Sequence, residues 1–555
     1  MISFEVFQLY MLVHILLNHN ANIPIYHRNE PNIRQYFGLF LLKITSKKNM
    51  LKDKKNTLTL AAVCLSSLMF GLEISSVPIL LPTLEKILKG NFSDVQWIMN
   101  AYTIACTTVL MASGTLADRY GRKLVFIIGL VLFGITSLLC GLASAMPLLI
   151  AGRFLQGLGG GIMLICQVAI LSHQFQDGRE RSFAFAAWGI VFGIGLGFGP
   201  LIGGLILTFL SWKWVFLAHV PLSILTIALA WAGVRESKSI QIQRLDTLGM
   251  VSLSISIFTL IYFITQGPEV GFTSIHGLMI IGSSAVCFLL FLYAEKTSIQ
   301  PMFDFTVFKI RDFSGAIIGS IGMNFCFWPF MIYLPIYFQG VLGYSSLMAG
   351  TALLAYTLPT LVIPPLAERL LLKYRPGIVI PLGLFIIGLG FILMWFGIHA
   401  AHLGHWSMMP GMLLSGIGLG LSNTTVTNTT TGSVSQDRAG MASGIDMSAR
   451  LITLAINIAL MGLLLSKGVF IHLKLAFVET FSTLQLHLAA EKIAAGNFTD
   501  ILEKIPGIAA ADPTGDITHE ALANGFKLLT LSSGIGVISL ALISFFVFKP
   551  ISQKK

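Results

Sequence analysis

The sequence predicts an all-α integral membrane protein with about fourteen transmembrane helices. Two observations predict this fold. Of the 555 residues, 55% are hydrophobic and 11% are charged, and the mean hydropathy is +0.81, whereas charged residues make up roughly 25% of an average soluble domain. Apolar runs of about 20 residues, the length that crosses ~30 Å of hydrocarbon as a helix, also follow one another along most of the chain.

The predicted spans form three groups. They lie near 58–83, 95–117, 124–144, 147–171, 183–209 and 214–234, then near 247–266 and 276–294, and finally near 313–338, 347–367, 377–398, 407–429, 441–465 and 525–548. We interpret 51–235 as a six-helix bundle, 236–311 as two inserted helices with an inner linker, and 312–548 as a second six-helix bundle. Residues 549–555 are then a cytoplasmic tail. The expected architecture is therefore two six-helix bundles with two extra central helices.

Basic residues predict the orientation. Arg119, Arg122 and Lys123 lie in a short turn between the second and third spans, and Lys and Arg recur in alternate loops. Because short cytoplasmic loops carry such an excess, both termini are predicted to be cytoplasmic, and a bacterial inner membrane is the expected location. This topology also explains the formal net charge of +11, so we expect no nucleic-acid partner.

Two segments do not fit the pattern of spans. Residues 1–50 contain an apolar run that is too short to cross the membrane, and a basic cluster follows Met50. We therefore expect translation to start at Met50, with an amphipathic segment on the membrane surface as the alternative. The outer loop 467–524 mixes helix-compatible polar sequence with a turn-rich stretch at 512–515, and we expect it to form a small periplasmic cap.

An internal repeat supports the division into two bundles. Residues 116–119 read Leu-Ala-Asp-Arg, and residues 366–369 read Leu-Ala-Glu-Arg at the inner end of the tenth span. Both quartets end the second helix of their bundle if the seventh and eighth spans are an insertion. Duplicated halves that move about a central site are the construction of many secondary transporters. A chance match at two basic loops is the alternative.

The turn from Gly114 to Lys123 contains the first candidate site. Gly114 and Gly121 would permit close helix approach and a tight turn that a β-carbon would obstruct. Asp118 lies beside Arg122 and other bases, and an acid at a helix end can pair with them or with the positive end of a neighbouring helix. Such a contact could hold one of two bundle arrangements, which would make this segment a conformational-switch loop. The alternative is that these residues only anchor the turn.

Small residues mark two further helices. Gly157, Gly159, Gly160 and Gly161 fail as a dinucleotide-binding loop because no strand precedes them and Ile162 takes the place of the last glycine, so we predict close helix packing. The fifth span contains a second such run, formed by Gly195, Gly199, Pro200, Gly203 and Gly204. We expect it to be a packing and bending surface.

Together these motifs resemble the signatures of the major facilitator superfamily. Residues 114–123 resemble its loop signature, Arg153 to Gly157 its fourth-helix motif, and 195–204 the fifth-helix motif of its antiporters. Segments 72–78, 96–102 and 334–339 are similar to the fourteen-helix drug:proton antiporters of the EmrB/QacA type. The likeness runs from about 58 to 548. The chain has Glu73 where that family usually has Asp, and Thr453 and Leu454 where it has a Gly pair, which puts the substrate range in doubt.

Polar and aromatic residues inside spans suggest a cavity. Asn423 and Asn428 belong to an unusually polar run in the twelfth span, and Asn324 and Trp328 lie in the ninth. Tyr102 joins them through the family resemblance. These side chains could line a wet cavity, or the hydroxyls and rings could simply be satisfied by backbone carbonyls and packing.

Glu73, near the middle of the first span, is the expected proton site, because burial disfavours the charged form of a carboxylate. At ~1.5 Å per residue, Glu73 lies about 15 Å and Arg153 about 10 Å from the predicted outer ends of their helices, so the two fall at similar depth. An acid that can pair with Arg153, bind a cation or take up a proton would couple drug release to proton entry. A fixed ion pair is the alternative.

These features predict a secondary transporter rather than an enzyme. No Gly-Lys-Ser or Gly-Lys-Thr occurs, so a P-loop ATPase is excluded, and the energy would come from an ion gradient without a cofactor. Six cysteines without a CxxC pair indicate no metal site. We expect export of lipophilic or cationic small molecules in exchange for protons across the lipid bilayer, with a periplasmic adaptor as a possible partner in the manner of some relatives. The alternatives are export of one metabolite, such as a siderophore, and a non-transporting membrane sensor.

Overall fold

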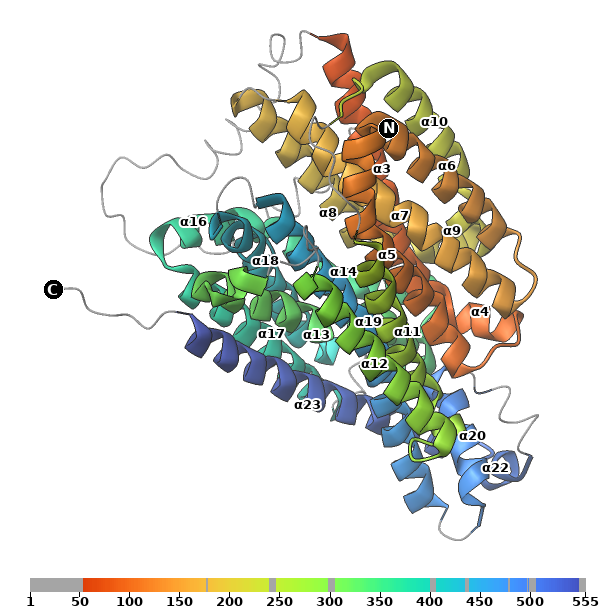
Figure 1. The fold of residues 1–555 in the computed structure, drawn as a ribbon. Helices are drawn as coiled ribbons and strands as arrows, with labels where there is room; N and C mark the ends of the chain where they lie inside the picture. Colours follow the sequence, from red (N-terminus) through yellow and green to blue (C-terminus); the bar gives the residue numbers. More distant parts are fainter. Residues whose placement is uncertain are drawn as a thin grey trace, which may run out of the picture. The chain divides into compact units, whose positions relative to one another are not determined.

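The computed structural model describes residues 53–175, 178–238, 246–297, 305–399, 406–434, 439–477, 480–496, 498 and 506–548. The predictions for 1–50 and 549–555 lie outside these residues. The described residues belong to one compact unit. Every regular element in the described part is helical (Figure 1).

The N-terminal bundle follows the six predicted spans closely. Its elements are α3 (Lys54–Ser76), η2 (Val77–Leu80), α4 (Leu81–Ile87), α5 (Phe92–Tyr120), α6 (Arg122–Gly141), α7 (Met146–Gln174), α8 (Gly178–Phe209), α9 (Lys213–Leu217) and α10 (His219–Gly233). The first span is broken where the sequence predicted one helix, because Pro78 and Pro82 lack the N–H that a continuous helix needs, and η2 and α4 result.

The second bundle shows the same effect of proline. Its elements are η3 (Phe305–Lys309), α13 (Arg311–Gly340), α14 (Ser346–Thr357), α15 (Pro359–Val362), α16 (Pro364–Lys373), α17 (Pro376–His399), α18 (Met409–Gly432), α19 (Ala439–Ala476), α20 (Thr483–Ala494), α22 (Pro506–Ala511) and α23 (Asp516–Val547). The tenth span is divided into three helices because Pro359 and Pro364 each start a new one.

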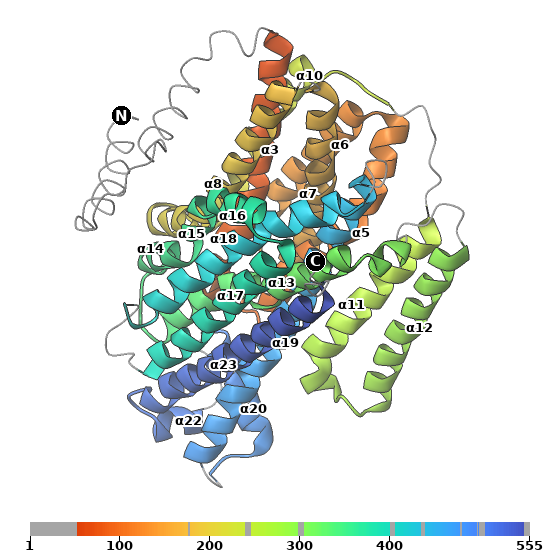
Figure 2. The same ribbon diagram turned by 90° about the vertical axis from the view of Figure 1, so that its left-hand side faces the viewer.

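Two further helices, α11 (Thr247–Val270) and α12 (Ile275–Thr297), lie together as a pair between the bundles in sequence (Figure 2). Ser256 and Ser284 join them by reciprocal bonds, in which each hydroxyl donates to the other's carbonyl at 3.0 and 2.8 Å. Trp97 of α5 packs against Phe258 and Tyr262 of α11, with ring centroids 5.5 and 6.3 Å apart. Ile257 and Ile261 of α11 also pack with Ala455 and Ala459 of α19, so the inserted pair contacts both bundles through α11.

The number of spans agrees with the predicted fourteen. Twelve helices or broken helices in the described residues are long and apolar enough to cross a membrane. The other two are α5, with 29 residues, and α18, with 24 residues. At ~1.5 Å per residue both exceed ~30 Å, and polar residues such as Asn100 in α5 and Asn423 in α18 lower their hydropathy.

The bundles touch through helix faces rich in small residues and at the predicted outer side. A β-carbon on Gly350 of α14 would lie 2.5 Å from the carbonyl oxygen of Pro200 in α8. At the predicted outer end, Nε2 of Gln339 donates to the carbonyl of Ile79 at 3.3 Å. Nζ of Lys492 in α20 lies 3.3 Å from Oε1 of Glu85 in α4. These contacts close that side of the bundle interface.

The segment predicted as an outer loop is partly helical. The helix α19 continues through Ala476, and α23 begins at Asp516, so both run into the region 467–524. Continuation of a helix satisfies backbone groups that a loop would leave open. Between them, α20 buries Leu486 and Ile493, and Ser482 with Gln485 forms its capping box.

Candidate functional site

The centre of the N-terminal bundle contains a buried ion pair between Glu73 of α3 and Arg153 of α7. Nη1 of Arg153 contacts Oε1 of Glu73, and both side chains have 0% exposure. Nη1 of Arg153 also donates to Oε1 of Gln156 at 2.7 Å, and Nε donates to the carbonyl of Ile98 at 3.1 Å. Gln156 is in turn held by Ser137, whose hydroxyl accepts from Nε2 at 2.9 Å. The two residues that the sequence placed at similar depth are thus in contact.

Tyr102 of α5 covers this ion pair. Cζ of Arg153 lies 4.3 Å from the centre of the Tyr102 ring, a cation–π geometry. Gly160 makes room for the tyrosine, since a β-carbon there would lie 2.5 Å from its hydroxyl oxygen. The glycine run of α7 therefore packs closely, as the sequence predicts, and it positions the aromatic ring over the guanidinium.

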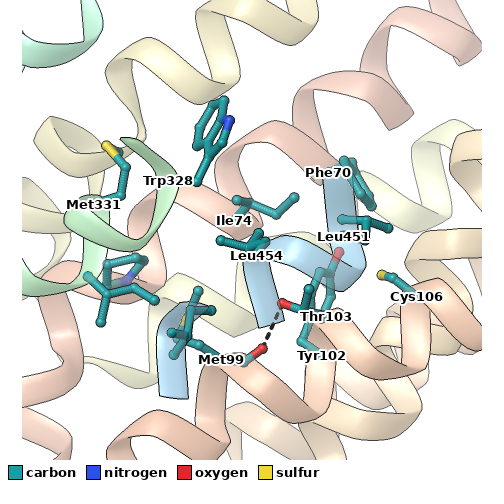
Figure 3. A pocket seen from close by; sticks show the side chains of 13 residues that line it. Phe70, Ile74, Met99, Tyr102, Thr103, Cys106, Trp328, Met331, Leu451 and Leu454 are labelled. Atoms are coloured by element: carbon teal, nitrogen blue, oxygen red, sulfur yellow. Dashed lines mark hydrogen bonds between the residues drawn. The ribbon is translucent and has the colours of Figure 1, made fainter. Parts of the chain in front are cut away.

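Tyr102 also lines a small cavity of about 20 Å³ between the two bundles (Figure 3). Its walls are almost entirely apolar and aromatic, and α3, α5, α13 and α19 contribute to them. The lining residues are Phe70, Ile74, Pro78, Met99, Tyr102, Thr103, Cys106, Trp328, Met331, Ile332, Leu451, Leu454 and Ile458. Of the predicted cavity residues, Tyr102 and Trp328 lie here, on the walls formed by different bundles. Leu454, which replaces a glycine of the resembling family, narrows the space.

A histidine completes the cluster around Glu73. His219 begins α10, and its Nδ1 lies 3.3 Å from Oε2 of Glu73, with 4% of the histidine side chain exposed. The same nitrogen lies 3.0 Å from the carbonyl oxygen of Val215, and Nε2 lies 3.3 Å from that of Met69. The Phe133 ring packs edge-on against the imidazole at 5.6 Å. Each carboxylate oxygen of Glu73 therefore faces a basic group.

The predicted polar wall of the C-terminal bundle is instead a separate charged cluster. Asp446 and Arg450 of α19 form an ion pair at 2.9 Å, with side-chain exposures of 1% and 12%. Nη2 of Arg450 donates to Oγ1 of Thr427 at 2.8 Å, and Nη1 donates to Oδ1 of Asn423. The Ser320 hydroxyl donates to Asp446. Asn423 therefore belongs to this network and does not line the cavity.

The other two asparagines also lie away from the cavity. Nδ2 of Asn324 donates to the carbonyl of Ser320 at 3.0 Å, one turn earlier in α13. Asn428 is exposed at the surface of α18. The hydroxyls of this run bond to carbonyls of their own helix, such as Thr425 to Leu421 at 2.7 Å, so the backbone-satisfied alternative holds for them.

In the loop signature, Gly121 is required by the backbone. It has φ of +119°, which side-chain-bearing residues rarely adopt, and it separates α5 from α6. The prediction of a close helix approach at Gly114 is wrong in this conformation, because a β-carbon there would lie 3.7 Å from Cγ2 of Ile165, an ordinary contact distance. Asp118 lies in the last turn of α5, and its side chain is outside the described part of the structure.

The carboxylate of Glu236 caps the helix that follows this turn. Its oxygens accept from the backbone N–H groups of Lys123 and Leu124 at 3.1 and 3.2 Å. The N–H of Arg122 donates to the carbonyl of Ser237 at 3.0 Å. A carboxylate favours the positive end of a helix, so the segment after α10 is tied to the signature loop.

The fifth-helix motif joins α8 to both bundles. β-Carbons on Gly195 and Gly203 would lie 2.9 Å from the carbonyl oxygen of Leu68 and 2.8 Å from that of Ser76, both in α3, and Gly199 faces the same helix. One on Gly204 would lie 2.7 Å from the Ser346 carbonyl in α14. Pro200 lies inside α8. These residues form the packing surface that the sequence predicts.

The sequence analysis missed three charged or titratable residues: His219, Glu236 and Asp446. His219 does not belong to a cluster within a single span, because its partners Glu73 and Met69 come from another helix. The signal for Asp446 was present, since an acid and a base four residues apart inside an apolar span face the same side of the helix. His219, at the start of the sixth span, gave only the signal of a lone polar residue.

Comparisons with known proteins agree with this architecture. The model of the Major Facilitator Superfamily matches residues 63–456. The chain is 29% identical over 414 residues to the multidrug resistance protein Stp of Mycobacterium tuberculosis (strain CDC 1551 / Oshkosh), covering 75% of this chain and 76% of that protein. It is 24% identical over 505 residues to the tetracenomycin C resistance and export protein of Streptomyces glaucescens, covering 88% and 91%.

A solved structure shares the fold. The crystal structure of a D-xylose-proton symporter matches with a TM-score of 0.55 at 15% identity, over 79% of this chain and 96% of that one. The family predicted from the motifs is confirmed, because its model covers well over half of the sequence. This chain belongs to the Major Facilitator Superfamily and is a multi-pass membrane transporter of small molecules.

Proposed function

We propose that this transporter exports lipophilic cations and amphipathic drugs from the cytoplasm in exchange for protons. One observation carries the proposal: Tyr102 both lines an apolar cavity between the bundles and contacts Arg153, the partner of Glu73 in the buried ion pair. A change in the charge of that pair would therefore act directly on the cavity wall.

At about 20 Å³ the cavity is closed to a drug-sized molecule in this conformation. If the bundles move apart, the residues that line it would favour an apolar substrate with aromatic or cationic character. Phe70, Tyr102 and Trp328 supply aromatic faces, and Met99 and Met331 supply adaptable thioethers. Aromatic faces attract organic cations, and methionine surfaces repack around ligands of different shape. The names of the two relatives, a multidrug resistance protein and a resistance and export protein, support the same class of substrate.

Proton coupling would follow from competition for Glu73. While Glu73 is ionised, it holds Arg153 beneath Tyr102. When it takes up a proton, the ion pair loses its attraction, and the guanidinium left behind is a buried charge without its counter-ion, which is costly. The bundle can relieve that cost by rearranging, and a rearrangement that alters the Tyr102 wall would release a bound cation.

Reconstitution of the chain alone into liposomes tests this function and shows whether an adaptor is needed. With an imposed proton gradient, the wild type should move ethidium against its concentration gradient, and a protonophore should abolish this movement. Glu73→Gln keeps the shape and hydrogen-bonding capacity but cannot titrate, so uphill transport should be lost. Glu295→Gln, which changes a buried carboxylate of α12 away from the cavity, is the matched control.

Undiminished protonophore-sensitive transport by Glu73→Gln would remove Glu73 from the coupling mechanism. Absence of gradient-driven transport by the wild type, for ethidium and for a panel of quaternary amines, would instead reject the drug:proton exchange itself. Both termini are predicted to be cytoplasmic. Protease accessibility in intact cells and in inverted vesicles checks this orientation.

A further inference from the structure

Within the described residues, the polar atoms in contact with the His219 ring nitrogens are all acceptors. Its Nδ1 faces the Val215 carbonyl at 3.0 Å and Oε2 of Glu73 at 3.3 Å. Its Nε2 faces the Met69 carbonyl at 3.3 Å. A neutral imidazole has one N–H donor and one nitrogen lone pair, so one of its nitrogens would present a lone pair to an oxygen lone pair. Imidazolium has two N–H donors, and both would find acceptors here.

The charges around the ring favour the same form. The helix α3 presents Glu73, α6 presents the uncharged ring of Phe133, and α9 presents the Val215 carbonyl. The positive group in this neighbourhood is Arg153 of α7, which contacts the other oxygen of Glu73. An ionised Glu73 therefore lies between two basic groups, and a buried charge is retained when it is paired and hydrogen-bonded.

We propose that His219 is a second proton-binding residue of the coupling site and exchanges its proton directly with Glu73. This proposal rests on the proposed function. In one state, imidazolium and carboxylate face each other. The N–H bond at Nδ1 then breaks and an O–H bond forms at Oε2, which gives neutral imidazole and carboxylic acid with no change in net charge. Arg153 loses its ionised partner in the same step, which links proton movement to the Tyr102 wall.

The arrangement differs from an ordinary buried histidine. His399, at the end of α17, also places Nδ1 against the carbonyl four residues earlier, at 2.9 Å from Trp395. That contact is the common helical one, and the described contacts of His399 include no carboxylate. The additional features at His219 are the Glu73 carboxylate oxygen 3.3 Å from Nδ1 and the Met69 carbonyl opposite Nε2. His399→Gln is therefore the matched control.

The protonation state can be measured without transport. In protein labelled with ¹⁵N-histidine and reconstituted in lipid, a resonance with two protonated ring nitrogens should persist at pH 7.5. It should be absent from His219→Gln, present in His399→Gln, and converted to a neutral tautomer in Glu73→Gln, which removes the negative partner. A neutral His219 resonance in the wild type at pH 7.5 would overturn the proposal.

Transport separates this proposal from the one on which it rests. His219→Gln retains an amide donor for Glu73 but cannot titrate, so gradient-driven ethidium transport should slow and its pH profile should lose one titration step. The profile of His399→Gln should match the wild type. If the wild type and Glu73→Gln behave as proposed while His219→Gln keeps the full pH profile, His219 only positions Glu73. If the wild type shows no gradient-driven transport, the exchange function fails instead.

Discussion

Gly121 packs directly against the carboxylate of Glu236 at the turn between α5 and α6. A β-carbon on Gly121 would lie 2.5 Å from Oε1 of that carboxylate, which caps the start of α6. The glycine is thus needed twice, for its φ of +119° and for the space it leaves. The sequence offered only the first reason. The cap that the turn receives comes from a residue more than a hundred positions away.

Gly121→Ala should therefore destabilise the protein. The strained backbone costs about 1–3 kcal/mol, and displacement of Glu236 would add the loss of its bonds to the N–H groups of α6. Gly114→Ala is the matched control, since its β-carbon meets only an ordinary contact. Thermal unfolding of the two variants in detergent checks the difference. Equal melting temperatures would mean that the turn rearranges freely.

Much of the fold follows from the sequence because hydrocarbon thickness sets the length of a spanning helix, and apolar runs of that length mark the spans along the chain. The depth of Glu73 and Arg153 followed from counting along their helices. The partners of Glu73 on other helices did not, because contact also depends on how each helix is rotated about its axis. Helices that are apolar all round carry little signal for that rotation. His219 was missed for this reason.

Asn423 was assigned to the cavity for a related reason. A polar residue inside a span can face water or another polar residue, and the sequence does not distinguish these cases. Asn423 accepts from Arg450, and Arg450 follows Asp446 by four residues in the sequence. The ion pair of Asp446 and Arg450 could therefore have been predicted from the sequence. The sequence does not show that α18 and α19 lie side by side, which brings Thr427 of α18 to the Arg450 guanidinium of α19.

Substitutions at Asp446 should show whether its ion pair with Arg450 stabilises the fold or takes part in transport. Asp446→Asn leaves Arg450, whose side chain is 12% exposed, without its charge partner. Breaking a fully buried pair typically costs about 3–5 kcal/mol, so the loss here should lie at or below the lower end of that range. The double variant Asp446→Leu with Arg450→Met removes both charges and should regain most of that loss. Chemical or thermal unfolding measures it. A double variant that is stable yet inactive would assign the pair to transport, whereas full activity would make it structural.

Gly160→Ala should disturb Tyr102, which lines the cavity and contacts the ion pair. The added methyl group would lie 2.5 Å from the Tyr102 hydroxyl oxygen, so the ring must move from its place over Arg153. Overpacking of this kind typically costs about 1–3 kcal/mol, and ethidium affinity should fall.

Two variants keep the Gly160 prediction specific. Gly189→Ala adds a methyl group to α8 where nothing lies within 4 Å, and it should behave as wild type. Combining Gly160→Ala with Tyr102→Phe removes the clashing oxygen and should restore part of the lost affinity. Fluorescence titration with ethidium measures both effects. Failure of the double variant to recover any affinity would show that the methyl group acts through another neighbour.

The final prediction concerns the contact between α20 and the first span. Lys492 reaches Glu85 at 3.3 Å and also donates to the carbonyl of Gly90 at 3.0 Å. Glu85 is fully buried, so removing the amine leaves its charge with weaker compensation, which is costly inside a packed structure. Lys492→Ala should therefore loosen α20 and the closed outer side of the bundles.

Lys474→Ala, which removes an exposed lysine of α19, is the control. Hydrogen exchange over 483–494 should accelerate in the first variant and not in the second. A cysteine introduced at Ser93 should also become more reactive to a membrane-impermeant maleimide if the predicted outer side opens. Unchanged exchange in Lys492→Ala would show that apolar packing by Leu486 and Ile493 alone holds α20 in place.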